Sequence, residues 1–389
     1  MKTVNSDLSI LFLGTQMEIA GSQRVMLSLA RWFQQAGYSV QTVFYYDKQS
    51  LEETWQRGAK FQITSLQARK VDSNPISNLF RLLRGQLRLF SMLRKNIKVV
   101  IAFTPHSNLL GLPIAWIAGV PVRIGTHHGH IDGSSKLLSW LHGRLTNLPL
   151  CSRMVAVSSQ VRDYAVQREG ASRGKIVVIE NGIESVESRD RSSESRRKIR
   201  ISLGLGEEVT LILTVGRLTL QKGHTYLLDA VKILASKYPR TKFVFAGEGP
   251  LRDGLQEKAN NLGISNSIQF LGVRDDTEDL LFAADIFVQP SVWEGLSLAL
   301  LEALRSSLPV VASRVEGVVD VVVDGESALL VPAKDPTALA ESIEKLIKDP
   351  ALRKQLAING HHRFLEKYSV DRMGRSYEEL ILNQIANAS

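Results

Sequence analysis

Cysteine is almost absent from this sequence, since Cys151 is the only one among 389 residues. A single thiol cannot form an internal disulfide, which is typical of proteins from reducing compartments. Long hydrophobic runs are also missing. The longest apolar stretch, residues 109–122, contains Pro113 and Pro121 and is shorter than the roughly 20 residues of a spanning helix. We therefore expect a core helix there and a cytoplasmic protein.

The amino terminus shows no pattern of a cleaved signal. Residues 8–14 read LSILFLG, but Asp7 and Ser9 interrupt the apolar character and no small-residue cleavage site follows. We predict a first β-strand in this position.

Acidic residues are outnumbered by basic ones, which gives a formal net charge of +9. A basic protein suits a polyanionic partner such as nucleic acid, an acidic membrane or phosphorylated substrates. Zinc-ligand spacing, RNA-stacking signatures and helix-turn-helix patterns are not found in the sequence, which disfavours nucleic acid. The remaining expectations are phosphorylated substrates and an anionic membrane surface.

The chain is too long for one ordinary hydrophobic core, so two domains are expected. Short apolar runs alternate with helical patterns in both halves, which predicts parallel sheets. In the first half we predict strands at residues 8–13, 38–46, 61–66, 99–103, 122–126, 154–157 and 176–179. In the second half we predict strands at residues 209–215, 242–246, 268–271, 286–289, 309–312 and 328–331.

Residues 284–332 contain the clearest candidate site. A predicted strand is followed by a loop with Glu294 and Gly295, and a helix that is expected to begin near Ser297 holds Glu302. This order places the loop at the carboxyl end of a parallel strand, where α/β sheets bind ligands. Gly295 allows close approach to the backbone, and Ser297 with the free amides of the first helical turn can bind a phosphate.

The two glutamates have two interpretations. Residues eight positions apart on a helix are about 12 Å apart and rotated by about 80°, so Glu294 and Glu302 can contact separate parts of one elongated ligand. Alternatively, both are solvated acids at a helix start, where the helix dipole stabilises them. The two residues alone do not decide between these interpretations.

A glycine-containing basic loop follows the first strand of the second half. It begins with Gly216 and Arg217 and continues to Lys222. Arginine can bind two phosphate oxygens at once and lysine adds a point charge, so this loop suits a diphosphate. An exposed basic loop without a ligand is the alternative. Gly247 lies in the turn FAGEG after the next strand, where it shapes the turn and its amide can border a nucleotide base.

Two further candidates lie in the first half. His127, His128 and His130 follow the fifth predicted strand. They have three interpretations: metal ligands, a general base, or polar loop residues. Zinc needs a fourth ligand and wider spacing, so we expect no metal. Gly21 and Ser22 begin the first predicted helix, where their amides can face a phosphate.

Together these motifs resemble the donor-site signature of the retaining GT-B glycosyltransferases of family 4, the group 1 glycosyltransferases. The matching elements are the E-x7-E pair within PSVWEGLSLALLEAL, the following LPVVAS, the GRL…KG element and the FAGEG turn. The segment around Gly21 resembles the family's G-G-x-E-R loop, but Ala20 replaces its first glycine and Gln23 replaces its acid. Further departures are Ser307 and Glu316 in place of glycines and Asp320 in place of a glutamate.

The resemblance implies two Rossmann-like domains facing each other across a cleft, without a metal or a cofactor. It implies a UDP- or GDP-sugar whose sugar contacts Glu294 and whose ribose contacts Glu302. His128 would line the sugar pocket, with His127 as the second choice. Arg217 and Lys222 would neutralise the departing diphosphate. The expected donor-binding residues are Gly21, Ser22, Gly216, Arg217, Lys222, Gly247, Gly295, Leu296, Ser297 and Glu302.

The same resemblance predicts the domain boundaries. Residues 1–183 would form the acceptor-side domain and residues 209–365 the nucleotide-sugar domain. Residues 184–208 are polar and mixed in charge, which is expected of a linker or of a solvated helix. Residues 366–389 would form a last helix that returns to the first domain.

The expected activity is retaining hexosyl transfer to a glycan, lipid-linked or other hydroxyl acceptor, in cell-surface polysaccharide or glycolipid synthesis. One alternative is a GT-B enzyme of another reaction class, a sugar-nucleotide epimerase or a phosphorylase. The other is a non-catalytic module that binds sugar nucleotides or glycans, and the presence of all four charged donor-site residues argues against it.

Residues 76–95 combine a leucine-rich helical stripe with cationic side chains. The first interpretation is a crossover helix that buries the stripe against the sheet and exposes its arginines. The second is a basic surface that attracts anionic lipid at the inner face of the membrane, with about 1 kcal/mol per cation. The cations of this segment are Arg81, Arg84, Arg88, Arg94 and Lys95.

Overall fold

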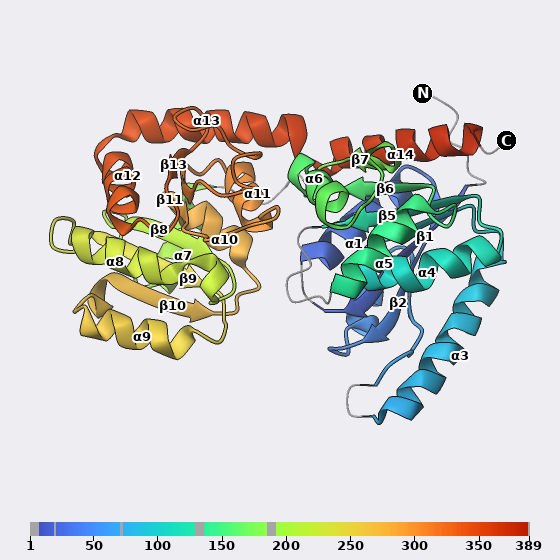
Figure 1. Ribbon diagram of the computed structural model, residues 1–389. Helices are drawn as coiled ribbons and strands as arrows, with labels where there is room; N and C mark the ends of the chain where they lie inside the picture. The colour runs from blue at the N-terminus through green and yellow to red at the C-terminus, as the bar shows by residue number, and fades with distance from the viewer. Residues whose placement is uncertain (1–7, 19–20, 71–72, 129–135, 185–191, 388–389) are drawn as a thin grey trace. The chain divides into compact units, whose positions relative to one another are not determined.

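The computed structural model describes residues 8–18, 21–70, 73–128, 136–184 and 192–387. The chain forms two compact units, one of Met1–Glu184 with Ser369–Ser389 and one of Ser185–Tyr368. Each unit contains one parallel sheet packed by helices (Figure 1). The predicted α/β fold class with two Rossmann-like domains is confirmed.

The first unit is built on a seven-stranded parallel sheet in the order β3-β2-β1-β4-β5-β6-β7. Its strands are β1 (Ser9–Met17), β2 (Ser39–Asp47), β3 (Gln62–Ser65), β4 (Val99–Ala102), β5 (Val122–His127), β6 (Arg153–Ala156) and β7 (Ile176–Val178). Its helices are α1 (Gly21–Gln35), α2 (Glu52–Gly58), α3 (Pro75–Leu93), α4 (Pro105–Ile117), α5 (Lys136–Asn147), α6 (Ser159–Arg168) and α14 (Val370–Ala386).

The second unit has a six-stranded parallel sheet in the order β10-β9-β8-β11-β12-β13. Its strands are β8 (Thr210–Val215), β9 (Thr241–Ala246), β10 (Ile268–Gly272), β11 (Ile286–Gln289), β12 (Val310–Ser313) and β13 (Leu329–Val331). Its helices are α7 (Ser193–Ser202), α8 (His224–Leu234), α9 (Arg252–Asn261), α10 (Thr277–Ala283), α11 (Leu298–Arg305), α12 (Pro336–Lys348) and α13 (Pro350–Lys367).

Burial of the central strands explains why they read as continuous apolar runs. Every residue of β4, β11 and β12 is buried, as expected for parallel strands covered on both faces. In both sheets the strand order reverses at one point, between β1 and β4 and between β8 and β11. Ligands bind at such reversal points, beyond the carboxyl ends of the strands.

The prediction that residues 184–208 form a linker is wrong for Ser193–Ser202, which form α7. Residues 185–191 lie outside the described residues, but α7 packs against α10 within the second unit. Arg200 is buried and donates hydrogen bonds to the Ala283 carbonyl (3.0 Å) and to Asp285 Oδ2 (3.2 Å). The polar composition of α7 does not reveal this anchor because its acidic partner lies far away in the sequence.

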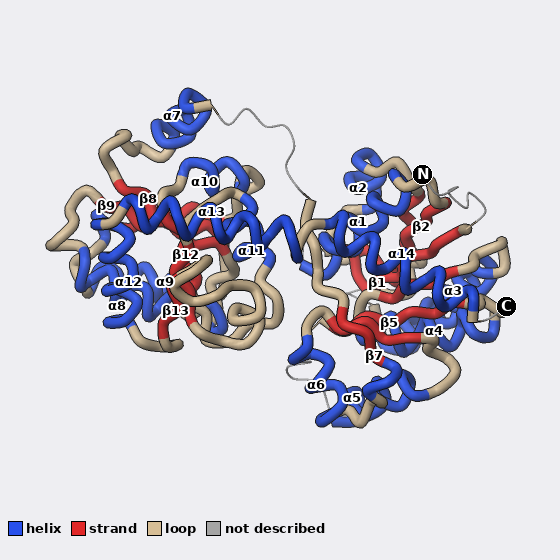
Figure 2. Tube along the Cα trace, turned by 90° about the horizontal axis from the view of Figure 1, so that it is seen from above, coloured by secondary structure: helices blue, strands red, loops and turns tan. Residues whose placement is uncertain are grey.

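The end of the chain also differs in detail from the prediction. α13 ends at Lys367 in the second unit, and α14 begins at Val370, not at residue 366, in the first. Figure 2 shows α14 beside α1. Trp32 Nε1 donates to Asp371 Oδ1 (2.9 Å), and the Tyr38 hydroxyl donates to Glu378 Oε1 (2.6 Å).

The structure contradicts burial of the whole α3 stripe, of which only the carboxyl-terminal part reaches the core. Only Gly85, Leu89 and Leu93 of this helix are buried, all in its second half. The helix extends beyond the sheet at its amino-terminal end, which leaves that part without a partner surface (Figure 1). The exposed apolar residues of α3 are Ile76, Leu79, Phe80, Leu83 and Leu87.

Candidate functional site

The loops after β8 and β11 are joined directly through their backbones. These strands are neighbours on the two sides of the reversal point. The Val292 amide donates to the Gln221 carbonyl (2.7 Å), and Gln221 Nε2 donates to the Trp293 carbonyl (3.2 Å). Gly223 has a φ of 63°, and a Cβ atom there would lie 2.0 Å from the Pro290 carbonyl oxygen. The GRL…KG loop and the glutamate loop therefore form one rigid edge.

This edge brings together two of the predicted site residues. Lys222 Nζ pairs with Glu294 Oε1, and the Ser291 hydroxyl donates to the same oxygen (2.8 Å). Glu294 is buried, whereas Lys222 is partly exposed. A carboxylate and an ammonium group are thus held side by side, so that an arriving anion can bind the ammonium while hydroxyl groups bind the carboxylate.

Helix α11 begins directly after the glutamate loop. Ser297 is its N-cap, accepts a hydrogen bond from the Leu300 amide (3.3 Å) and donates to Gln289 Oε1 (2.8 Å). Glu302 lies within the helix and is buried. Glu294 is not helical, so the expected helical spacing between the two glutamates is wrong. The loop conformation, and not the helix, sets their separation.

Gly295 and Leu296 complete this loop before the cap. Gly317, with a φ of 64°, lies against it so closely that a Cβ atom would be 1.3 Å from the Gly295 carbonyl oxygen. Gly295 and Leu296 are both partly exposed, which leaves the loop accessible from the opposite side. The amides that precede α11 are therefore supported from behind and open to a ligand.

Two glycine turns lie side by side after β8 and β9. Gly216 and Gly247 have φ angles of 156° and 149°, and a Cβ atom on Gly247 would be 1.9 Å from the Gly216 carbonyl oxygen. The Gly216 amide donates to the Ala246 carbonyl (3.0 Å). Arg217, next to Gly216, is exposed. The two glycines allow the turns to lie in direct backbone contact, and the side chains of Arg217 and Glu248 beside them are exposed.

In the first unit, the predicted residues Gly21 and Ser22 are the first two residues of α1. Gly21 is exposed at the start of α1, and Ala20 lies outside the described residues. The Ser22 hydroxyl donates to Gln23 Oε1 (2.7 Å), and Gln23 Nε2 donates to the Gln16 carbonyl (3.1 Å). Gln23, which replaces the family's acid, is therefore buried and ties the helix to β1.

His128 follows β5 and is partly exposed, whereas His130 lies outside the described residues. Its Nε2 atom is 2.8 Å from Thr126 Oγ1, and its Nδ1 atom is 3.5 Å from Asn181 Nδ2. Burial of the imidazole and the neighbouring His127 lower the pKa of His128 from 6.5 to about 3. The ring is therefore neutral near pH 7 and suited to hydrogen bonding.

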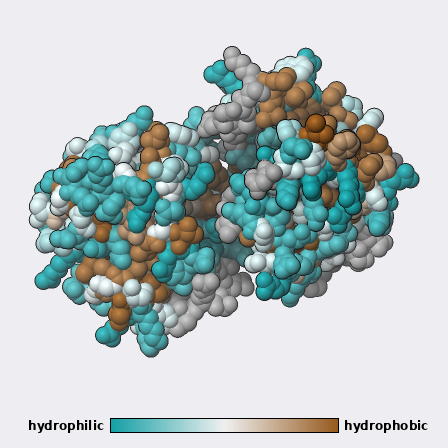
Figure 3. Space-filling view, turned by 90° about the horizontal axis from the view of Figure 1, so that it is seen from below, coloured by the Kyte–Doolittle hydropathy of each residue, from teal (hydrophilic) through white to brown (hydrophobic). Residues whose placement is uncertain are grey.

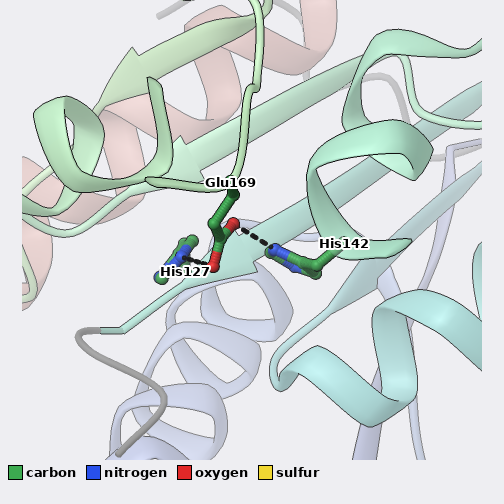
Figure 4. A group of neighbouring side chains, drawn as sticks. All are labelled: His127, His142 and Glu169. Atoms are coloured by element: carbon green, nitrogen blue, oxygen red, sulfur yellow. Dashed lines mark hydrogen bonds and ion pairs between the residues drawn. The ribbon is translucent and has the colours of Figure 1, made fainter. Parts of the chain in front are cut away.

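His127 turns into the interior and belongs to a group that the sequence pattern does not reveal. Figure 4 shows the Glu169 carboxylate between His127 and His142. Its oxygens lie 3.1 Å from His127 Nε2 and 2.9 Å from His142 Nδ1, and all three residues are buried. Burial opposes ionisation of Glu169, but the two imidazole hydrogen bonds outweigh it and lower its pKa from 4.5 to about 2.

These side chains are of types that bind metals, and their donor atoms lie within 4.8 Å of one another. Each carboxylate oxygen already accepts one imidazole hydrogen bond. Asn108 Nδ2 lies 2.9 Å from His142 Nε2, so that nitrogen accepts and Nδ1 carries the proton. The group is a hydrogen-bonded clamp that joins β5, α5 and the end of α6, directly beside His128.

No helix in the described parts of the chain is both long and apolar enough to cross a membrane.

Both halves of the chain match known families. Residues 19–186 match the model described as Glycosyltransferase Family 4, and residues 195–363 match the model described as Glycosyl transferases group 1.

Curated relatives agree with these matches. An uncharacterised glycosyltransferase of Methanocaldococcus jannaschii is 32% identical over 226 residues, which cover 57% of this chain and 58% of that protein. The chain thus spans less than two thirds of that relative. The Escherichia coli UDP-Gal:alpha-D-GlcNAc-diphosphoundecaprenol alpha-1,3-galactosyltransferase is 25% identical over 320 residues, or 80% of this chain and 82% of that protein.

Solved structures share the fold. The Anabaena protein HepE in complex with UDP-glucose has a TM-score of 0.83 and 20% identity, and the match covers 97% of this chain and 100% of that one. WaaG, a glycosyltransferase involved in lipopolysaccharide biosynthesis, has a TM-score of 0.71 and 17% identity over 96% of this chain and 99% of that one.

Proposed function

The chain belongs to the group 1 glycosyl transferases of the GT-B fold, and from this premise we propose that it is a retaining hexosyltransferase. Its donor is a UDP- or GDP-sugar and its acceptor is a hydroxyl of a glycan or a lipid-linked glycan. The observation that carries the proposal is the Lys222–Glu294 pair on the joined loops after β8 and β11. It supplies a cation for phosphate and a carboxylate for sugar hydroxyls at one sheet edge.

In the proposed mechanism the chain itself compensates the charge of the leaving group, and no metal or cofactor takes part. The bond between the anomeric carbon and the diphosphate oxygen breaks while the acceptor oxygen attacks from the same face. The acceptor proton passes to the departing phosphate. Lys222, Arg217 and the amides at Gly295 and Ser297 stabilise the developing negative charge.

The remaining residues orient the donor. Glu294 binds hydroxyls of the transferred sugar, and Glu302 binds the ribose. Gly247 leaves room beside the nucleotide, and Leu296 belongs to the loop that contacts the donor. In the first unit, Gly21 and Ser22 offer amides to a phosphate, and the neutral His128 donates or accepts a hydrogen bond with a sugar hydroxyl. These roles rest on the family motif and on the positions of the residues after the strands of the two sheets.

We assign the acceptor to surface-polysaccharide or glycolipid synthesis because several relatives act there. Besides the E. coli galactosyltransferase, the Staphylococcus aureus capsular polysaccharide glycosyltransferase CapM is 26% identical over 308 residues, which cover 74% of this chain and 80% of that protein. We place the enzyme at the cytoplasmic side of the membrane, where the nucleotide sugar is available.

The first unit also presents a surface suited to an anionic bilayer. Figure 3 shows hydrophobic side chains gathered at the upper right, on this unit. Neighbouring helices α3, α4 and α5 expose large apolar residues beside the cations of α3. Aromatic and leucine side chains insert among acyl chains while arginines bind lipid phosphates, so we infer peripheral membrane contact. The exposed residues of α4 and α5 are Trp116, Ile117, Leu137, Trp140 and Leu141.

A panel of nucleotide sugars tests the proposed function. Binding of each donor and its slow hydrolysis without acceptor are measured on the full chain. We expect one UDP- or GDP-sugar to bind and to release the nucleoside diphosphate and the free sugar. A new sugar nucleotide formed without acceptor would indicate an epimerase, and failure of every donor to bind would overturn the proposal.

A further inference from the structure

A pocket of about 360 Å³ lies within the first unit. Its floor includes Tyr45 and Tyr46 near the end of β2, and its walls come from Leu79 and Leu82 of α3 and Leu110 of α4. It therefore occupies the carboxyl edge of the sheet, where α/β folds bind ligands. Its size lies within the range of roughly 300–1000 Å³ that is common for ligand pockets.

The interior of this pocket is apolar because its tyrosine hydroxyls have partners at the edges. The Tyr45 hydroxyl donates to Gln86 Oε1 (3.2 Å), and the Tyr46 hydroxyl contacts Gln16 Oε1. Thr15, Asn78 and His106 also line the cavity. The Thr15 hydroxyl pairs with that of Thr104, and the Asn78 amide donates to the Lys70 and Ser73 carbonyls, so the remaining lining is mainly aromatic rings and leucines. Such a lining excludes a sugar, whose hydroxyls would lose their hydrogen bonds to water, and favours a hydrocarbon chain.

Arg69 supplies a positive charge at the rim of the pocket. The guanidinium group of Arg69 lies 5.5 Å from the centre of the Tyr46 ring, and the residue is exposed. None of the described acidic residues pairs with it. A cation–π contact positions Arg69 without neutralising its charge, so it remains available to a phosphate at the mouth of the pocket.

The pocket is continuous with the exposed stripe of α3. Leu79 belongs to both, with 57% of its surface exposed, and Phe80 and Leu83 extend the apolar surface along the helix. A chain that leaves a bilayer over α3 can therefore enter the pocket across apolar surface.

We propose that this pocket binds the isoprenoid chain of a diphosphate-linked acceptor, in the segment next to the phosphate, with Arg69 on the diphosphate. The proposal rests on the proposed function, because it names the lipid that carries the acceptor sugar. It assigns the recognition of that lipid to the first unit, independently of the donor loops. The apolar interior and the continuity with α3 suit the hydrocarbon chain, and the cation at the rim suits the diphosphate, so together they favour an amphipathic ligand of this kind.

Binding of farnesyl diphosphate to the full-length protein, measured by titration calorimetry, tests the proposal. Leu82→Trp fills the pocket and should weaken binding at least tenfold. The matched control is Leu83→Trp, one position along the same helix and 53% exposed, which should bind as the parent does. Leu79→Trp, at the exposed rim, blocks the entrance with little disturbance of packing and guards against misfolding of Leu82→Trp.

The chemistry of the ligand is tested in the same assay. Arg69→Gln should lower the affinity for farnesyl diphosphate about tenfold and leave farnesol binding unchanged. Equal affinity of parent, Leu82→Trp and Leu79→Trp, or binding of inorganic diphosphate as tight as that of farnesyl diphosphate, would overturn the proposal. Donor hydrolysis is followed in parallel. Its presence without farnesyl diphosphate binding rejects the lipid pocket alone, whereas its absence in the parent rejects the proposed function.

Discussion

His128 and Glu169 show how burial and hydrogen bonds set the charge of single residues beside the candidate site. His128 follows β5, and its pKa is lowered from 6.5 to about 3. Burial is the larger cause and the neighbouring His127 is the smaller one. The neighbouring His127 is held by Glu169 through a hydrogen bond of 3.1 Å. The imidazole of His128 is therefore neutral near pH 7, and that of His127 anchors the strand end.

We predict that His128 does not titrate between pH 8 and pH 5. An ordinary histidine would gain a proton in this interval, near pH 6.5. Because the folded-state pKa is depressed, protonation costs stability only as the pH falls below 6.5. NMR of the imidazole resonances, assigned with His128→Asn, measures this directly. An inflection near pH 6.5 that disappears in the variant would contradict the prediction.

Glu169 should also make stability fall on acidification, but in a lower pH range than His128. Its folded pKa of about 2 lies below the ordinary 4.5, so its stabilisation is complete above pH 4.5 and is lost as the pH falls toward 2. We expect Glu169→Gln to lower the free energy of unfolding by about 3 kcal/mol at pH 7, and by much less at pH 3. Urea unfolding of parent and variant measures the difference. A constant difference at both pH values would show that the carboxylate charge is not involved.

The sequence predicts some of these residues and not others. Glu294 and Lys222 are recognisable because motif spacing places them after predicted strands. The clamp is not, because His127, His142 and Glu169 share no periodic pattern and meet only in the folded chain. Ser307 stands where the family has glycine, and it adopts a φ of 55°. This left-handed backbone conformation favours glycine, so the structure explains why the family has glycine at this position.

At the scale of elements, the joined loops after β8 and β11 depend on glycines. Gly223→Ala should lower the free energy of unfolding by more than 1 kcal/mol, because Gly223 has a φ of 63° and its new Cβ would collide with the Pro290 carbonyl. It should also lower turnover, since Lys222 and Glu294 would move apart. The control is Gly254→Ala in α9, where nothing lies within 4 Å of the new Cβ. Thermal unfolding and donor hydrolysis are measured for both, and equal behaviour of the two variants would contradict the coupling.

Helix α3 carries the prediction of membrane contact. The parent should float with anionic vesicles at low salt and less so at high salt, because each arginine near the surface contributes about 1 kcal/mol. Changing Arg81, Arg84 and Arg88 to glutamate should abolish flotation. The matched control makes the same charge change at three exposed lysines of the second unit, Lys232, Lys354 and Lys367. If the parent stays at the bottom of the gradient at low salt, the membrane contact is wrong.

Elements were predictable where their pattern is local. All the predicted strands are found because buried parallel strands read as apolar runs between helices. The stripe of α3 predicts an amphipathic helix, but not whether a sheet or another surface receives its apolar face. α7 reads as a solvated segment because the partner of Arg200, Asp285, is remote in sequence.

At the scale of the whole molecule, the fold follows from the repeated strand–helix order, while the boundary between the units does not. α14 belongs to the first unit because Trp32 and Tyr38 bind its acidic side chains. These contacts are between residues at opposite ends of the chain, and no composition change marks them. The family resemblance indicates a returning helix, but the break at Ser369 appears only in the structure.

The measurement that tests the account most directly is donor turnover of the parent and Lys222→Ala in the presence of EDTA. We predict that the parent keeps its full rate with the chelator, because Lys222 and Arg217 compensate the diphosphate charge. Lys222→Ala should fold normally and lose about 10²–10³ in kcat, as expected for a group that stabilises transition-state charge. The exposed Lys354→Ala should match the parent. Loss of parental activity in EDTA that Mg²⁺ or Mn²⁺ restores, or an unchanged kcat in Lys222→Ala, would contradict the account.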